Sequence, residues 1–271
     1  MNGSRPRRAS AQTVARLRRT LSERDLLIIA SVIECRFLTS GQLQRWHFPC
    51  GEGLHTPGSG ARVARRVLAR LNEQRLLVRL SRRIGGVRAG SSGHVYAAGP
   101  IGQRVLYPDR PPRRFNEPST AFLDHTLAVS EIVVRLAEAD RAGAAELLEC
   151  QTEPDCWRRF NPLSGSVLKP DLRVTLGVGA KEQHWFVEVD QGTVHLPSVI
   201  RKCRVYQDYF RSGAEQSQAG VFPRVLWLTT PARVKPLQRA IARDLADPRE
   251  LFMVAEQDAA PGIMIDPRER P

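Results

Sequence analysis

The sequence has few cysteines, almost no lysine and no paired-cysteine motif. Its five cysteines are odd in number and form no CxxC, so neither a disulfide framework nor a zinc ribbon is indicated. Free thiols are usual in a reducing cytoplasm, which is the setting we expect. Most bases are Arg, and a genomic preference for Arg codons explains this scarcity of Lys.

No apolar stretch is long enough to cross a bilayer. The longest run extends from Leu26 to Val32 and is interrupted by Ser31, whereas a span needs roughly 18 to 20 apolar residues. No basic segment followed by an apolar one opens the chain, as a signal peptide would require. With 42% hydrophobic and 25% charged residues, the composition is that of an ordinary globular protein. We therefore expect a soluble cytoplasmic protein without a membrane partner.

Charge is abundant and unevenly distributed. The chain has 41 Lys and Arg against 28 Asp and Glu, a net charge of +13. Residues 1–117 contain 22 Arg, no Lys and seven acids, a net charge of +15, whereas residues 118–271 contain 19 bases and 21 acids, a net charge of −2. Because a basic surface gains affinity for a polyanion by releasing counterions, the front part favours binding of nucleic acid.

The front part predicts a winged helix-turn-helix. Apolar spacing predicts helices at about 23–35, shortly after Ser40 and at about 60–75, then strands at 77–80 and 94–98 around a basic Gly-rich loop. In that fold the third helix enters the major groove and the loop lies along a neighbouring groove. The residues assigned to double-stranded DNA are Arg62, Arg65, Arg66, Arg70, Arg82, Arg83 and Arg88. A winged helix that contacts only proteins, with a solvated arginine face, stays open.

The composition and the periodicity also predict the domain limits. We expect a flexible basic arm at 1–20, the winged helix at 21–106, a Pro- and Arg-rich linker at 107–118, a second domain at 119–256 and a tail at 257–271. The second domain begins with a helix at 122–137. Strands follow at 147–151, 172–176, 185–189 and 225–228, with a further one expected at 251–254 and helices around the fourth. This order predicts an α/β (α+β) fold with a mixed sheet.

Three carboxylates are expected to meet at one edge of this sheet. Asp171 enters one strand, and Glu188 and Asp190 end the next. Residues i and i+2 of a strand share a face, so Glu188 and Asp190 project together. Mg²⁺ or Mn²⁺ prefers such oxygen ligands, and a bound cation activates water and stabilises charge on a phosphodiester. The sequence therefore predicts a metal site at Asp171, Glu188 and Asp190.

This arrangement resembles the PD-(D/E)xK nuclease superfamily, whose core is helix, three strands, helix, strand. Pro170-Asp171 and Glu188-Val189-Asp190 stand at its two motif positions. More narrowly, the chain from about 21 to 255 resembles the replication-relaxation family of plasmid and mobile-element proteins. The resembling stretches are 21–25, 122–131, 169–171, 186–193 and Arg201-Lys202 ahead of Tyr206. The resemblance implies a role in plasmid DNA replication or relaxation at an origin-like site. The chain is also similar to a class of conjugation relaxases with this fold.

One position departs from the superfamily pattern. Asp190 stands where that pattern usually has Lys, two residues after Glu188. Lys202 on the following helix is a candidate for the missing ammonium, because lysine migrates to that helix within the superfamily; it would neutralise the scissile phosphate or orient water. Two interpretations stay open. One is a Mg²⁺-dependent endonuclease or nickase, and the other is an inactive DNA-binding regulator or an adaptor for relaxosome or replication proteins.

Four further residues are candidates near this site. His125 is either a phosphate contact or base, or a histidine of the helix core. Glu131 resembles an additional acid that some superfamily members carry on the first helix, and is otherwise a solvated acid. Tyr206 could link covalently to DNA, with aromatic packing as the alternative. Gln191 belongs to a turn with Gly192 that frees the strand end.

Overall fold

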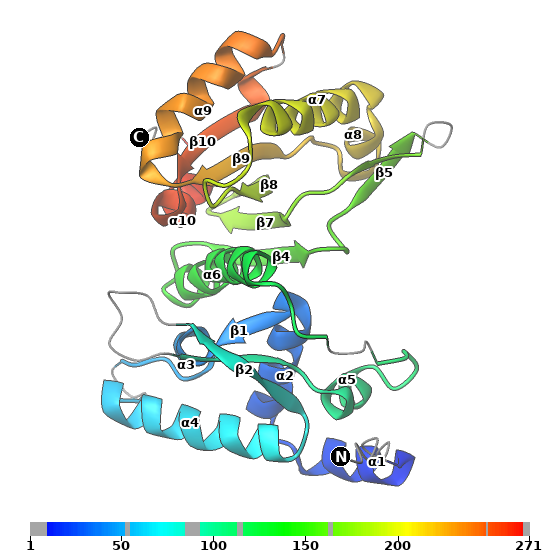
Figure 1. Cartoon of the computed structure of the whole chain (residues 1–271), viewed down its shortest axis with the longest axis vertical. Coiled ribbons are helices and arrows are strands. Elements are labelled where there is room, and N and C mark those ends of the chain that lie inside the picture. Colours follow the sequence, from blue (N-terminus) through cyan, green and yellow to red (C-terminus); the bar gives the residue numbers. More distant parts are fainter. Residues whose placement is uncertain are drawn as a thin grey trace. The chain divides into compact units, whose positions relative to one another are not determined.

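The structure of the chain is a computed structural model that describes residues 10–51, 55–84, 93–112, 116–161, 165–247 and 249–267. It divides into two compact units, Met1–Ser130 (unit 1) and Glu131–Pro271 (unit 2). Helix α6 (Thr120–Arg141) begins in unit 1 and ends in unit 2 (Figure 1). Among the described residues, no helix is long and apolar enough to span a membrane.

Unit 1 contains the three helices and two strands that the sequence predicts, in the predicted order. Its helices are α1 (Ala11–Thr20), α2 (Glu23–Cys35), α3 (Ser40–His47), α4 (Pro57–Glu73) and α5 (Pro100–Leu106), and its strands are β1 (Phe37–Thr39), β2 (Leu77–Ile84) and β3 (Gly93–Ala98). The strands form an antiparallel sheet of order β1-β3-β2. Strand β1 was not predicted, because three residues are too few to show a period in the sequence.

Side-chain caps fix where the helices of unit 1 begin. Ser22 and Asp25 form a capping box at the start of α2, and Thr39 and Gln42 form another at α3. The Thr56 side chain accepts a hydrogen bond from a backbone N–H at the start of α4, whose first residue is a proline. These local bonds satisfy backbone donors that the helix itself leaves unpaired.

Two predictions for unit 1 require correction. Residues 11–20 form helix α1 instead of continuing the flexible arm, because Ser10 caps the helix and Val14 is buried. Strand β2 extends to Ile84, so Arg82 and Arg83 belong to the strand and not to the loop; the pairing with β3 resumes after an irregularity that follows Arg79. Arg88 and residues 1–9 lie outside the described residues.

Unit 2 is built on a five-stranded mixed sheet of order β10-β9-β8-β7-β4. Its strands are β4 (Glu146–Thr152), β7 (Leu172–Val178), β8 (Lys181–Val189), β9 (Arg224–Thr229) and β10 (Phe252–Glu256), beside a separate hairpin of β5 (Arg158–Asn161) and β6 (Ser166–Leu168). Strands β4, β7 and β8 pair antiparallel, and β8, β9 and β10 pair parallel. The predicted α+β class and the mixed sheet are confirmed. The hairpin was not predicted, since its strands are short and carry several polar residues.

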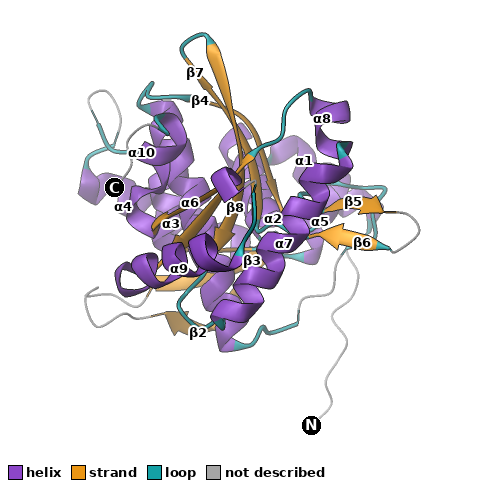
Figure 2. Ribbon diagram, turned by 90° about the horizontal axis from the view of Figure 1, so that it is seen from above, coloured by secondary structure: helices purple, strands orange, loops and turns teal. Residues whose placement is uncertain are grey.

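Helices α7 (Leu196–Ser212) and α9 (Pro231–Asp244) cover one face of this sheet (Figures 1 and 2). Their apolar sides share one core with the strands, in which Tyr206 and Leu237 of the helices pack with Phe186 and Trp227 of the sheet. Helix α8 (Ala214–Ala219) follows α7. The two helices therefore turn their remaining sides outward, away from the sheet.

The C-terminal segment contributes to unit 2 and is not only a tail. Short 3-10 turns at Arg249–Leu251 and Gln257–Ala259 flank β10, and α10 (Ala260–Ile265) follows. The carbonyl oxygen of Met264 accepts a hydrogen bond from the Trp185 indole at 3.1 Å, and both side chains are buried. Helix α10 therefore belongs to the fold of unit 2, with Ala260, Ile263 and Met264 buried.

Candidate functional site

A buried polar cluster surrounds Glu188 at the end of β8. Glu188 is 2% exposed. Its Oε1 atom accepts a hydrogen bond from the Tyr206 hydroxyl at 2.6 Å, and its Oε2 atom accepts one from the Lys202 ammonium. Lys202 and Tyr206 lie four residues apart on α7, a spacing that puts both on the same side of a helix. The lysine expected from the following helix is therefore in contact with the motif glutamate.

Asp171 joins this cluster from the position directly before β7, the strand next to β8. It is 7% exposed, and its Oδ2 atom accepts a hydrogen bond from the backbone N–H of Val189 at 2.7 Å. Its own N–H donates to the carbonyl oxygen of Val187 at 3.1 Å. These bonds fix Asp171 beside the end of β8, where its charge acts on both Glu188 and Lys202.

Burial makes ionisation of the cluster costly. Desolvation raises the pKa of Glu188 to about 8, and the charge of Asp171 adds to this, against the stabilising effect of Lys202. Burial by itself would lower the pKa of Lys202, but the carboxylates of Glu188 and Asp171 outweigh that effect and raise it. Burial and the neighbouring Glu188 hold the pKa of Tyr206 well above its usual range. Lys202 is therefore the cation of this site, and Tyr206 is a neutral donor.

Asp190 has a different partner. It is 1% exposed, and its Oδ2 atom lies 2.5 Å from Nε of Arg233 on α9. Its Oδ1 atom accepts a hydrogen bond from the backbone N–H of Gly192 at 2.9 Å. Arg233 also donates to the carbonyl oxygens of Gly192 and Val194. The pair therefore holds the loop between β8 and α7.

The structure does not assemble the three predicted carboxylates into one metal-binding group. In the part of the chain that the structure describes, no group of three or more His, Cys, Asp or Glu is placed to hold a metal ion. Asp190 faces the same side of the sheet as Glu188, as the strand period predicts, but Arg233 neutralises it there. Asp171 and Glu188 remain as neighbouring carboxyl groups, and the Lys202 ammonium donates a hydrogen bond to Glu188. Carboxyl oxygens are the kind of donor that a divalent cation prefers, so these two residues are the ones that would hold it.

The four further candidates have different surroundings. Glu131 on α6 forms an ion pair with Arg135 at 3.0 Å. His125 is half-buried on the part of α6 that belongs to unit 1. Gln191 follows Asp190 in the loop, and its Nε2 atom is buried without a hydrogen-bond partner among the described residues. Tyr206 is fully buried against Phe186, which agrees with aromatic packing.

Helix α4 of unit 1 separates its apolar residues from its arginines. Ala64, Leu68 and Leu71 are buried, whereas Arg62, Arg65 and Arg66 are exposed. Arg70 differs from these arginines because its guanidinium lies 2.6 Å from the buried Asp25 carboxylate. Arg70 therefore ties α4 to the capping box of α2, a role that its sequence position does not reveal.

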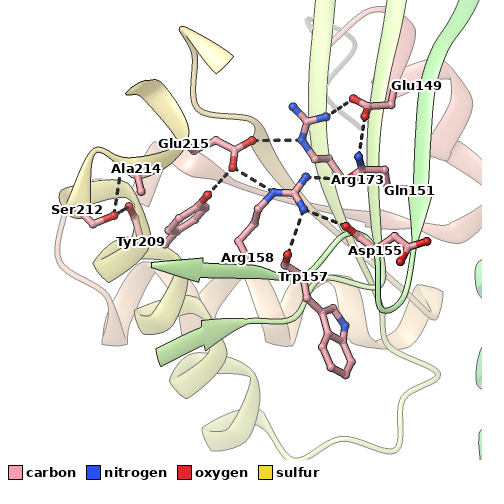
Figure 3. A network of polar contacts seen from close by, with 10 residues as sticks. All are labelled: Glu149, Gln151, Asp155, Trp157, Arg158, Arg173, Tyr209, Ser212, Ala214 and Glu215. Atoms are coloured by element: carbon pink, nitrogen blue, oxygen red, sulfur yellow. Dashed lines mark hydrogen bonds and ion pairs between the residues drawn. The ribbon is translucent and has the colours of Figure 1, made fainter. Parts of the chain in front are cut away.

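Sequence reasoning missed a second charged network in unit 2 (Figure 3). The buried Glu215 of α8 lies 3.3 Å from Arg158 and 3.2 Å from Arg173, and it accepts a hydrogen bond from the Tyr209 hydroxyl. Arg173 also pairs with Glu149 of β4. The network joins the end of α7 to the sheet and to the hairpin. Its one sequence signal was Arg173, a base within the otherwise apolar run of β7.

Comparison with protein families shows which family the chain matches. The model of the family described as replication-relaxation matches residues 29–225. No curated protein and no solved structure matches the chain. The matched range extends from α2 to the start of β9, so it covers the arginine face of α4 as well as Asp171, Glu188 and Lys202.

Proposed function

The chain belongs to the replication-relaxation family, and on this premise we propose that it binds duplex DNA through a winged helix-turn-helix in unit 1. The observation that carries this proposal is the exposed arginine face of α4, formed by Arg62, Arg65 and Arg66 opposite a buried apolar side. The third helix of a helix-turn-helix is the element that enters the major groove. Guanidinium groups on that helix reach both phosphates and guanine edges.

The wing strands support the same proposal. Strand β2 carries Arg79, Arg82 and Arg83 and leads toward the Gly-rich segment before β3. In winged helices this hairpin lies along the DNA backbone beside the groove. A net charge of +15 in residues 1–117 adds the long-range attraction that steers a protein to DNA.

The salt dependence of DNA binding tests this function. Each lost phosphate contact flattens the slope of log affinity against log salt concentration by about 0.9. Arg65→Glu/Arg66→Glu is therefore expected to flatten it by nearly two units. The control Lys181→Glu/Arg224→Glu changes two exposed bases of unit 2 by the same total charge. If the α4 variant keeps the wild-type affinity and slope, unit 1 does not bind DNA through α4.

A second candidate function, metal-dependent nicking, is favoured by the meeting of Asp171, Glu188 and Lys202. Asp171 and Glu188 would hold the cation, which when bound supplies activation of water and neutralisation of phosphodiester charge. Lys202 carries a proton next to Glu188 and is placed to hold a phosphate oxygen or to orient water. The grouping supports the proposal of a PD-(D/E)xK-like site whose lysine comes from the following helix.

Nicking of supercoiled plasmid in Mg²⁺ or Mn²⁺ tests the second candidate. Wild type is expected to convert the plasmid to the open circular form, and Asp171→Ala and Glu188→Gln are expected to abolish this. The control Asp208→Asn removes an exposed acid of α7 and should retain activity. If wild type leaves the plasmid supercoiled at every metal concentration, unit 2 is not a nickase. The chain would then act as a DNA-binding regulator or as an adaptor for relaxosome or replication proteins.

A further inference from the structure

The charge of unit 2 is segregated between its helices and the rest of the unit. Residues 131–271 carry 19 bases and 20 acids, so the unit is nearly neutral. Helices α7 and α9 alone carry eight of these bases and two of the acids. The rest of the unit therefore has 11 bases and 18 acids. A nearly neutral total conceals one strongly basic region.

The bases of α7 and α9 form one outward surface. The two helices lie next to each other (Figure 2). Their apolar side chains pack into one core with those of the sheet. The exposed bases are Arg201, Arg204 and Arg211 on α7 and Lys235, Arg239 and Arg243 on α9. Those of α9 recur every four residues, so they form a row along the helix with steps of about 6 Å. We call these six residues the α7/α9 basic surface.

Few acids neutralise this surface. Asp208 forms an ion pair with Arg211 at 3.3 Å, and Asp244 forms one with Arg243 at 2.7 Å. Within the described ranges, Arg201, Lys235 and Arg239 take part in no ion pair. All three side chains are exposed on the two helices. They are available to an external anion at little desolvation cost.

The other exposed residues of α7 and α9 indicate which class of anion this surface binds. None of the exposed large apolar side chains of the described chain lies on either helix. A protein partner needs aromatic or aliphatic anchors at the centre of its interface. A single strand of nucleic acid needs aromatic platforms on which its bases stack. A polar and strongly positive surface without either is typical of contact with the backbone of duplex DNA.

We propose that the α7/α9 basic surface is a second DNA-binding surface, which takes the phosphodiester backbone of a duplex independently of base sequence. The inference rests on the proposed function in that DNA is the ligand, but it does not depend on α4. Arg201 is adjacent to Lys202, whose ammonium contacts Glu188, so the surface borders the buried carboxylate cluster. A duplex on this surface would lie next to the residues proposed to act on it.

The salt dependence of binding to a nonspecific duplex several helical turns long tests this surface. Arg201→Glu/Arg239→Glu removes one cation from each helix and is expected to flatten the slope of log affinity against log salt by roughly two units. Lys181→Glu/Arg224→Glu is the control, with the same charge change at the first residues of β8 and β9. Thermal unfolding verifies that both variants fold. If either fails, Arg201→Gln/Arg239→Gln replaces the first and Lys181→Gln/Arg224→Gln the second.

The outcomes separate this inference from the proposed function. A flatter slope for the α7/α9 variant, with the control at the wild-type slope, supports the second surface. Equal slopes for the two variants overturn it, because the effect is then one of net charge or is absent. Weakened binding by Arg65→Glu/Arg66→Glu alone supports the α4 proposal and overturns the second surface. If only Arg201→Glu/Arg239→Glu weakens binding, the second surface is supported and the α4 proposal is overturned.

Discussion

Arg233 neutralises Asp190 inside unit 2. The Arg233 Nε atom and the Asp190 Oδ2 atom are 2.5 Å apart, with side chains 18% and 1% exposed. Asp190 stands two residues after Glu188, where the pattern that this sequence resembles usually has a lysine. A charge that the sequence assigned to a metal is instead compensated by a base from α9.

Removal of Arg233 is expected to destabilise the protein strongly. Arg233→Ala leaves the Asp190 carboxylate buried without its cation, which costs about 3 to 5 kcal/mol of unfolding free energy in comparable buried pairs. Urea unfolding measures the loss. Arg239→Ala on the same helix is the control, since Arg239 is exposed and its removal should change stability by less than about 0.5 kcal/mol. Equal stabilities for the two variants would mean that the ion pair contributes nothing.

The unfolding free energy is expected to fall as the pH rises, because the pKa of Glu188 is raised in the folded protein. Its pKa is about 8 in the folded protein against an ordinary value of 4.5, so the folded state binds more protons than the unfolded state between these values. The unfolding free energy therefore decreases as the pH increases from about 4.5 to about 8. Glu188→Gln should flatten this part of the profile, and Glu182→Gln, an exposed position on the same strand, should not. Denaturant unfolding at a series of pH values measures both.

Substitutions of Arg70 and Arg66 should have different effects on stability and on DNA binding. Arg70→Ala takes the partner from the buried Asp25 carboxylate, and the Arg70 side chain is 41% exposed, so solvent screening limits the expected loss to about 1 kcal/mol. Arg66→Ala removes an exposed side chain and should leave the unfolding free energy within about 0.5 kcal/mol. Thermal melts and DNA titrations of both variants check this. Weaker DNA binding with unchanged stability is expected for Arg66→Ala.

Two glycines of unit 1 should respond in opposite directions to alanine. A Cβ at Gly102 of α5 would meet the carbonyl oxygen of Leu76 at 2.2 Å, whereas one at Gly58 of α4 meets nothing within 4 Å. Gly102→Ala therefore overpacks the junction and should cost about 1 to 3 kcal/mol. Gly58→Ala should stabilise α4 by up to about 1 kcal/mol, because alanine loses less backbone entropy in a helix. Melting temperatures on opposite sides of wild type are the expected result.

Periodicity and short apolar runs were sufficient for most of the secondary structure. The helices α2, α4 and α6 bury a side that repeats at the helical period. The strands β7, β8 and β9 each contain five consecutive buried residues, which the sequence shows as short runs rich in apolar residues. Elements of three or four residues, such as β1 and β5, were missed because they are too short to show a repeat. Helix α1 was missed because its stability depends on a cap at Ser10 and on burial of Val14, neither of which a basic composition indicates.

The sequence by itself determined the two-part charge and the α+β class, since these depend on composition and on period. It offered Lys202 only as a candidate, through a resemblance, and the structure showed its contact with Glu188. The tertiary structure alone decided the partners of Asp190 and Arg70. Asp25 and Arg70 are 45 residues apart, and Asp190 meets a base from α9. Backbone preferences act over a few neighbouring residues, whereas a buried charge is compensated by whichever residue packing brings beside it. The same packing placed the bases of α7 and α9 on one surface, which net charge along the chain had concealed.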